Sequence, residues 1–103
     1  MPVKKRVHEL KCWPEPFAAL LDGRKRFEVR VDDRGFAVGD VLVLHEWDPY
    51  LDRHDYSSCK GEYTQRDPVR MLVTYILHGG RFGLPEDVCV MSVEPDGSQP
   101  VPP

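Results

Sequence analysis

GRKRFEVR, residues 23–30, reads G-x-K-x-x-E-x-R and places a glycine and a run of charges where a helix meets a strand. Successive side chains of a strand point to opposite faces, so the apolar ones should share the core face: Phe27, Val29 and Val31. The opposite face then carries only charge: Arg26, Glu28 and Arg30. Residues two apart on one face of a strand lie roughly 6.5 Å from each other. Glu28 and Arg30 are therefore close enough to hold one small ligand or to pair, with Lys25 at the strand entry.

A short helix should precede this strand, within PEPFAALLDG, residues 14–23. Prolines and an acid occupy the first turn, and Phe17, Leu20 and Leu21 follow at helical spacing. Gly23 has the conformational freedom for the positive φ of a helix C-cap, which turns the chain sharply into the strand. We therefore interpret the glycine of the motif as structural.

Four further segments alternate or run apolar in the manner of strands. They are residues 5–11 (KRVHELK), 41–47 (VLVLHEW), 69–77 (VRMLVTYIL) and 88–93 (VCVMSV). Together with the motif strand they predict an α+β domain of about five strands, with one short helix after the first strand. A sheet this short is expected to close most of its edges by curling into a small barrel.

The length of 103 residues predicts one domain, residues 1–94, followed by a proline-rich flexible tail, 95–103. Residues 48–68 are polar and aperiodic, and so long a loop is a candidate for a lid. We expect three side chains to lie in the core: Trp47, Tyr75 and Cys89. HGGRFG, residues 78–83, is interpreted as a turn that brings Arg81 close to the site.

Composition is ordinary for a globular protein, with 41% hydrophobic and 30% charged residues. No apolar run approaches the roughly 20 residues that span a bilayer, so we expect a cytoplasmic protein with no membrane partner. Three cysteines without close spacing favour reduced thiols over disulfides or zinc: Cys12, Cys59 and Cys89. The histidines at 45, 54 and 78 also lack the spacing of metal ligands, so no metal and no cofactor is predicted.

Charge is divided unevenly along the chain. Residues 1–30 carry eight Lys or Arg against four acids, whereas the remaining 73 carry six against thirteen. Most of the surface would repel a long polyanion, which favours a partner that is a single nucleotide or a short single strand. Chance segregation of charge in a small chain is the alternative.

The motif, with its helix before it and F-x-V-G-D-x-L-x-L after it at residues 36–44, resembles the ASCH-domain family of the PUA-like superfamily. H-x-L-K-x-x-P from residue 8, E-W-D at 46–48 and V-T-Y-I-L at 73–77 are similar to a branch of small uncharacterised bacterial and phage proteins. The resemblance covers residues 8 to about 93. It implies a PUA-like pseudo-barrel with a cleft beside the helix that binds RNA or a nucleotide.

The resemblance also implies possible catalysis, because some members are amidohydrolases acting on N4-acylated cytidine and others are associated with ribonuclease activity. In the amidohydrolases a threonine that acts with the motif lysine stands at the position of Glu28. On that reading Lys25 and Glu28 are the catalytic residues, with Glu28 as a general base for water.

As a binding site, the cluster would hold phosphate or a base carbonyl through Lys11, Lys25 and Arg30, while Glu28 accepts hydrogen bonds from an exocyclic amine. Trp13 or a loop tyrosine would stack on the base. The partner is then RNA, another single-stranded nucleic acid or a nucleoside. Two other readings stay open: an ion pair of Glu28 with Lys25 or Arg30 on an open strand face, and a protein-interaction role for the acidic loop.

Overall fold

The computed structural model describes residues 6–51 and 61–97, and within them one helix and six strands. In chain order these are β1 (Val7–Cys12), α1 (Pro14–Leu21), β2 (Phe27–Val31), β3 (Val41–Asp48), β4 (Glu62–Tyr63), β5 (Val69–His78) and β6 (Val88–Pro95). The α+β class and the single helix after the first strand are confirmed. The strand missing from the sequence prediction is β4, whose two residues are too few to show alternation.

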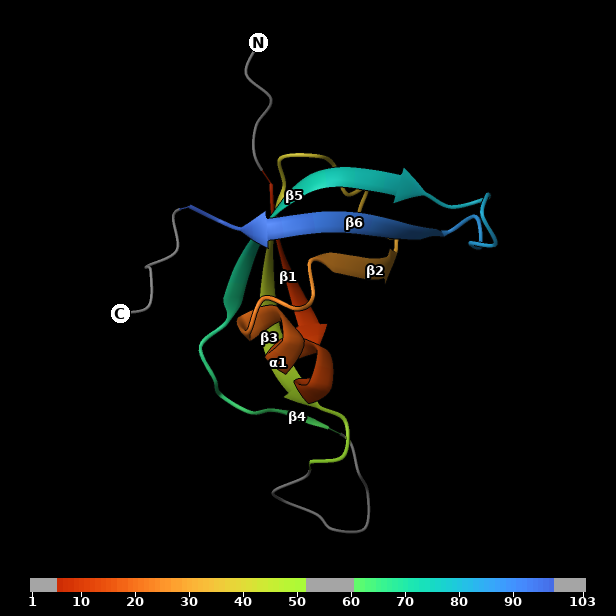
Figure 1. The fold of residues 1–103 in the computed structure, drawn as a ribbon. Coiled ribbons are helices and arrows are strands. Elements are labelled where there is room, and N and C mark those ends of the chain that lie inside the picture. Colours follow the sequence, from red (N-terminus) through yellow and green to blue (C-terminus); the bar gives the residue numbers. More distant parts are fainter. Residues whose placement is uncertain (1–5, 52–60, 98–103) are drawn as a thin grey trace.

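The strands form one mixed sheet in the order β1-β3-β5-β6-β2, with β4 paired to β3. β1 runs parallel to β3, and every other pair is antiparallel. Figure 1 shows β6, β2 and the second half of β5 running across the direction of β1 and β3, with α1 beside β3. The sheet is not closed, because β1 and β2 stand at opposite ends of the strand order.

Helix α1 begins and ends where the sequence indicates. Trp13 is extended before it and Pro14 opens it, while Phe17 and Leu20 are buried. Gly23 has a φ of +84°, and its N–H donates to Leu20 at 3.3 Å. Lys25 N–H then donates to Ala19 O at 3.0 Å. This turn delivers the chain into β2 within a few residues, as expected of a glycine C-cap.

The core lies between the curled sheet and α1. Residues 41–44 of β3 are all buried, as a strand covered on both faces should be. Cys89 is buried as predicted. The buried cluster also includes Leu10, Phe17, Phe36, Met71, Ile76, Met91 and Val93.

The orientation of β2 is the reverse of the prediction. Phe27, Val29 and Val31, expected in the core, are 48, 52 and 54% exposed, whereas Glu28 is only 3% exposed. The reason is the pairing with β6, whose buried residues alternate: Cys89, Met91 and Val93. Register places Glu28 opposite Met91 and Arg30 opposite Cys89, so the charged face of β2 points inward. The neighbouring strand decides the face, not the pattern of β2 itself.

Tyr75 is also misplaced by the sequence prediction, since it is 61% exposed. The β5–β6 register shifts between Val73 and Tyr75. Such a bulge inserts one residue, here Thr74, and reverses which face the following side chains occupy. Val73 and Ile76 are therefore both buried, and Tyr75 points outward.

His8 and Asp40 form a buried polar pair at the start of β1. His8 Nε2 and Asp40 Oδ2 are 2.8 Å apart, and the imidazole packs edge-on against Phe36. Asp40 Oδ2 also accepts from the Ala37 N–H at 3.0 Å and from Arg6 at 3.2 Å. Burial alone would raise the pKa of Asp40, but the hydrogen bonds from His8 and Ala37 and the charge of Arg6 outweigh it and leave the pKa lowered. His8 is thus a structural residue.

The predicted tail and the predicted lid are described only in part. β6 continues to Pro95, and residues 98–103 of the tail lie outside the described residues. Residues 52–60 of the lid also lie outside them. No helix in the described part of the chain is long and apolar enough to cross a membrane.

We expect Asp40→Asn to destabilise the protein at pH 7 by about 1 to 3 kcal/mol, since it removes a charged hydrogen-bond acceptor. The pKa of Asp40 is lowered in the folded state, so its contribution is present above the unfolded value of about 3.9 and is lost as pH falls through the folded value. Urea denaturation should therefore show a smaller difference between variant and wild type at pH about 2 than at pH 7. Asp33→Asn, at an exposed side chain, is the control; an equal Asp40→Asn effect at both pH values would contradict this account.

Candidate functional site

Glu28 is the centre of the site. Its Oε1 accepts from Lys25 Nζ, and its Oε2 accepts from Arg30 Nε at 3.0 Å. Lys25 comes from the turn after α1 and Arg30 from the next inward position of β2, and their side chains are 15 and 24% exposed. Glu28 thus forms the ion pairs with Lys25 and Arg30 that the sequence suggested, but on a buried face of the strand and not on an open one. A carboxylate this deeply buried requires such cationic partners.

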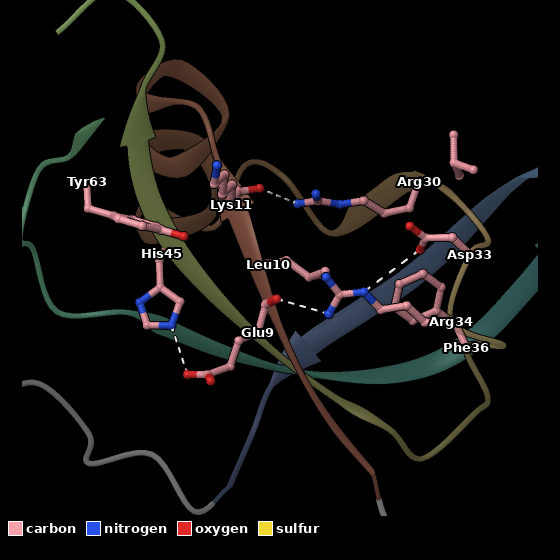
Figure 2. Close-up of a pocket in the computed structure, with 10 residues that line it drawn as sticks. Glu9, Leu10, Lys11, Arg30, Asp33, Arg34, Phe36, His45 and Tyr63 are labelled. Atoms are coloured by element: carbon pink, nitrogen blue, oxygen red, sulfur yellow. Dashed lines mark hydrogen bonds and ion pairs between the residues drawn. The ribbon is translucent and has the colours of Figure 1, made fainter. Parts of the chain in front are cut away.

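Arginines span the gap that the sheet leaves between β1 and β2. Arg30 donates a second hydrogen bond, from its terminal nitrogen to Lys11 O at 2.8 Å, and Arg34 donates to Glu9 O at 3.0 Å (Figure 2). Val41 N–H donates to Arg6 O, so the even-numbered residues of β1 direct their main-chain N–H and C=O groups toward β3. The carbonyls of Glu9 and Lys11 therefore point to the open edge, and arginine side chains satisfy them.

The structure brings all five predicted ligand-binding residues to one cavity of about 440 Å³, called here the motif cavity. They are Lys11, Trp13, Lys25, Glu28 and Arg30. The wall also includes Cys12, Pro16, Phe27, Val29 and Trp47. A volume in this range suits a nucleoside-sized molecule.

A second cavity, of about 620 Å³, adjoins the first and shares Lys11 and Arg30 with it. Figure 2 shows its lining, with Tyr63 and His45 on one side and Arg34 and Phe36 on the other. Its lining carries both acidic and basic side chains, which lie close to each other. His45 Nε2 is 3.1 Å from Glu9 Oε1, and Arg34 Nε is 3.8 Å from Asp33 Oδ1.

Aromatic rings flank the cation at the boundary of the two cavities. Lys11 Nζ lies 4.5 Å from the ring centroid of Trp47 and 5.9 Å from that of Tyr63. The prediction that Trp47 lies in the core is therefore wrong. Its ring lines the motif cavity and contacts the Lys11 ammonium group. Trp13 is 53% exposed and meets Tyr50 edge-on at 6.4 Å, so part of its ring is available for stacking.

Cys12 is a buried residue that lines the motif cavity, and the sequence did not predict it as part of the site. Its pKa is raised to about 11, chiefly by burial and next by the negative charge of Glu28, with Lys25 and Arg30 acting in the opposite direction. The side chain is therefore a neutral thiol at neutral pH, which argues against a nucleophilic role. Glu46, buried beside it, raises the same pKa and is held by Thr64 and Arg66.

The remaining sequence predictions separate by position. Arg81 lies in the β5–β6 connection and lines neither cavity. His54, Tyr56 and Cys59 lie outside the described residues. Tyr63, one of the loop tyrosines predicted to stack, lines the second cavity. His45 was missed as a cavity residue because β1 pairs with β3 over a distance in the sequence that no local pattern records, and no sequence signal pointed to Arg34. Within the described residues, no three His, Cys, Asp or Glu side chains gather as a metal site.

The electrostatic effect of Glu28 on the Cys12 thiol has a measurable consequence. Glu28→Gln removes an anion that raises the pKa of Cys12 and leaves the two cations that lower it. We expect alkylation of Cys12 by iodoacetamide at pH about 8 to accelerate, since a lower pKa raises the thiolate fraction, by about tenfold for each pKa unit. Peptide mass spectrometry measures Cys12 separately from Cys89.

Cys89 serves as the internal control, because burial raises its pKa first and the nearby charge is that of Asp32. Equal acceleration at both cysteines would mean that the fold has loosened. An unchanged rate at Cys12 in a folded Glu28→Gln variant would contradict the electrostatic effect. Glu9→Gln, at an exposed acid on β1, should leave both rates unchanged.

Comparison with known proteins gives two matches. The uncharacterised 12.9 kDa protein in the GpA 3′ region of Escherichia phage P2 is 45% identical to this chain over 42 residues, which is 41% of this chain. This chain matches 38% of the length of that phage protein. The family model for the domain of unknown function DUF3850 matches residues 7–93, from the first residue of β1 to within β6. The chain therefore belongs to the DUF3850 family.

Proposed function

We propose that this protein is an ASCH-type domain that binds a nucleoside unit, free or within single-stranded RNA, in the motif cavity. The observation that carries the proposal is the buried Glu28, fixed between Lys25 and Arg30 in the wall of a cavity that also presents Trp13 and Lys11. A fixed acceptor beside cations and aromatic rings is the combination that recognises a base and its phosphate.

Each group has a distinct task in this proposal. An ionised carboxylate offers about four acceptor positions, so Glu28 retains capacity for an exocyclic amine after it has accepted from Lys25 and Arg30. Lys11 Nζ, at the boundary of the two cavities, would meet a phosphate. The half-exposed ring of Trp13 would stack on the base.

A hydrolase acting on an acylated cytidine or on RNA is the second candidate, because Lys25 and Glu28 touch each other within the same cavity. To activate water, Glu28 would have to direct an oxygen to the water while both oxygens hold cations. That double engagement favours recognition over catalysis, so binding is the primary proposal.

The test is thermal shift and turnover measured together, with cytidine, N4-acetylcytidine, cytidine monophosphate and short single-stranded RNAs. A ligand at about 100 times its Kd adds about 2.7 kcal/mol, which raises the Tm of a domain this size by about 10 to 20 °C. Trp13→Ala and Lys11→Ala leave the Glu28 ion pairs in place and should each weaken binding by about tenfold or more. RNA binding should also weaken steeply with salt.

Matched controls lie on the β5–β6 connection. Phe82→Ala removes an aromatic ring that is more exposed than Trp13, and Arg81→Ala removes an exposed cation, both away from the cavity. Turnover that Lys25→Ala abolishes in a folded variant would favour the hydrolase. If no compound in the panel shifts the Tm or is turned over, both candidates are wrong.

A further inference from the structure

The outer edge of β2 is an open hydrogen-bonding edge. Val93 N–H donates to Arg26 O at 3.0 Å, and Asp32 N–H donates to Asp87 O at 2.7 Å. In an antiparallel ladder the residues that bond to the partner strand alternate, so the even-numbered residues of this segment face β6. The N–H and C=O groups of Phe27, Val29 and Val31 therefore face away from the sheet. Of these groups, only the C=O of Val31 has a further hydrogen bond in the described part of the chain, which it accepts from the Asp33 N–H at 3.0 Å.

The same three residues carry half-exposed apolar side chains, so this edge combines unpaired main chain with apolar surface. An edge of this kind is a template for another strand. The opposite face of β2 bears Glu28 and Arg30, and inward-pointing charges are a device that discourages pairing with unsuitable strands. A strand that pairs here must supply opposite charges in register.

We propose that the strand that pairs with this edge is β2 of a second copy of the protein, antiparallel, with the two-fold axis at Val29. In that register Phe27 lies opposite Val31 of the second copy, and Val29 lies opposite its own counterpart. Glu28 lies opposite Arg30, and Arg26 lies opposite Asp32. Each charge in residues 26–32 thus meets the opposite charge, and each apolar side chain meets an apolar one. The main-chain groups of Phe27, Val29 and Val31 are then paired.

Other registers do not offer this complementarity. A shift of two residues one way places Glu28 opposite Glu28, and a shift the other way places Arg30 opposite Arg30. Parallel pairing in register places every charge opposite its own copy. Like charges directly opposite each other destabilise a strand pair, and opposite charges stabilise it. Among the pairings of two copies, the charges of RFEVRVD therefore favour this one register.

The interface is small, since it consists of one strand from each copy. Interfaces well below about 1,200 Å² are characteristic of weak complexes, so we expect a dimer with Kd of about 10 to 100 µM. β2 also borders both cavities, through Val29 at one and Val31 at the other. The second copy would therefore lie along their openings and contribute its Arg30 near Glu28.

Sedimentation or light scattering from about 5 to 500 µM brackets this range and measures the dimer directly. Wild type should approach twice its monomer mass of 11.9 kDa at the highest concentration. Val29→Lys places two ammonium groups together at the two-fold axis and should weaken dimerisation by about tenfold or more. Val38→Lys, at a valine of similar exposure before β3, is the matched control and should dimerise like wild type.

Charge is tested separately. Arg26→Asp places two acids opposite each other at both ends of the strand pair and should also weaken the dimer, whereas Arg81→Asp makes the same change in net charge away from β2.

Amide hydrogen exchange gives the register. Exchange at Phe27, Val29 and Val31 should slow as concentration rises, while exchange at Glu28 and Arg30, already bonded to β6, should not change.

A wild type that stays monomeric across this range overturns the proposal. So does a dimer that Val29→Lys and Arg26→Asp leave intact, because the copies would then associate elsewhere. Exchange protection at the edge without a change in mass would also count against self-pairing. None of these outcomes depends on whether the motif cavity binds a nucleoside.

Discussion

A carboxylate buried on the inner face of an edge strand is the interaction on which the rest of this structure depends. Glu28 must have cationic partners at that depth, since an uncompensated buried charge costs several kcal/mol. Lys25 is in reach only because the helix ends at a glycine and the chain turns at once. Arg30, the other partner, also reaches across to the main chain of β1. One ion-pair cluster therefore links the helix C-cap, the last strand of the sheet and the first.

The same cluster supports the register in which β2 pairs with β6. A slip of one residue would exchange the two faces of β2, placing Phe27, Val29 and Val31 inside. Hydrophobicity alone favours that slipped arrangement. It would, however, turn Glu28 and Arg30 outward together and break the hydrogen bond from Arg30 to Lys11 O. In the observed register β2 has charges toward the protein and apolar side chains toward solvent, which is the reverse of an ordinary surface strand.

Local patterns predicted the elements and the membership of the motif cavity. The helix with its glycine cap, the α+β class, and the convergence of Lys11, Trp13, Lys25, Glu28 and Arg30 follow from spacing and from the family resemblance. What failed depends on contacts distant in sequence. The face of β2 is set by β6, and the outward turn of Tyr75 is set by a bulge. The parallel pairing of β1 with β3 brings His45 and Trp47 beside Lys11 and creates the second cavity.

The arginine side chains that cross the gap between β1 and β2 determine what it costs to widen that gap. Two side-chain hydrogen bonds, from Arg30 to Lys11 O and from Arg34 to Glu9 O, hold the two edges where a closed barrel would have a full ladder. Hydrogen bonds of charged groups are worth about 1.5 to 3 kcal/mol each when shielded, and less when exposed. Widening this gap would break these two hydrogen bonds and no strand pair, so it should cost less free energy than unfolding. A guest that offers those arginines its own oxygens could take the place of the β1 carbonyls and widen the gap as it enters.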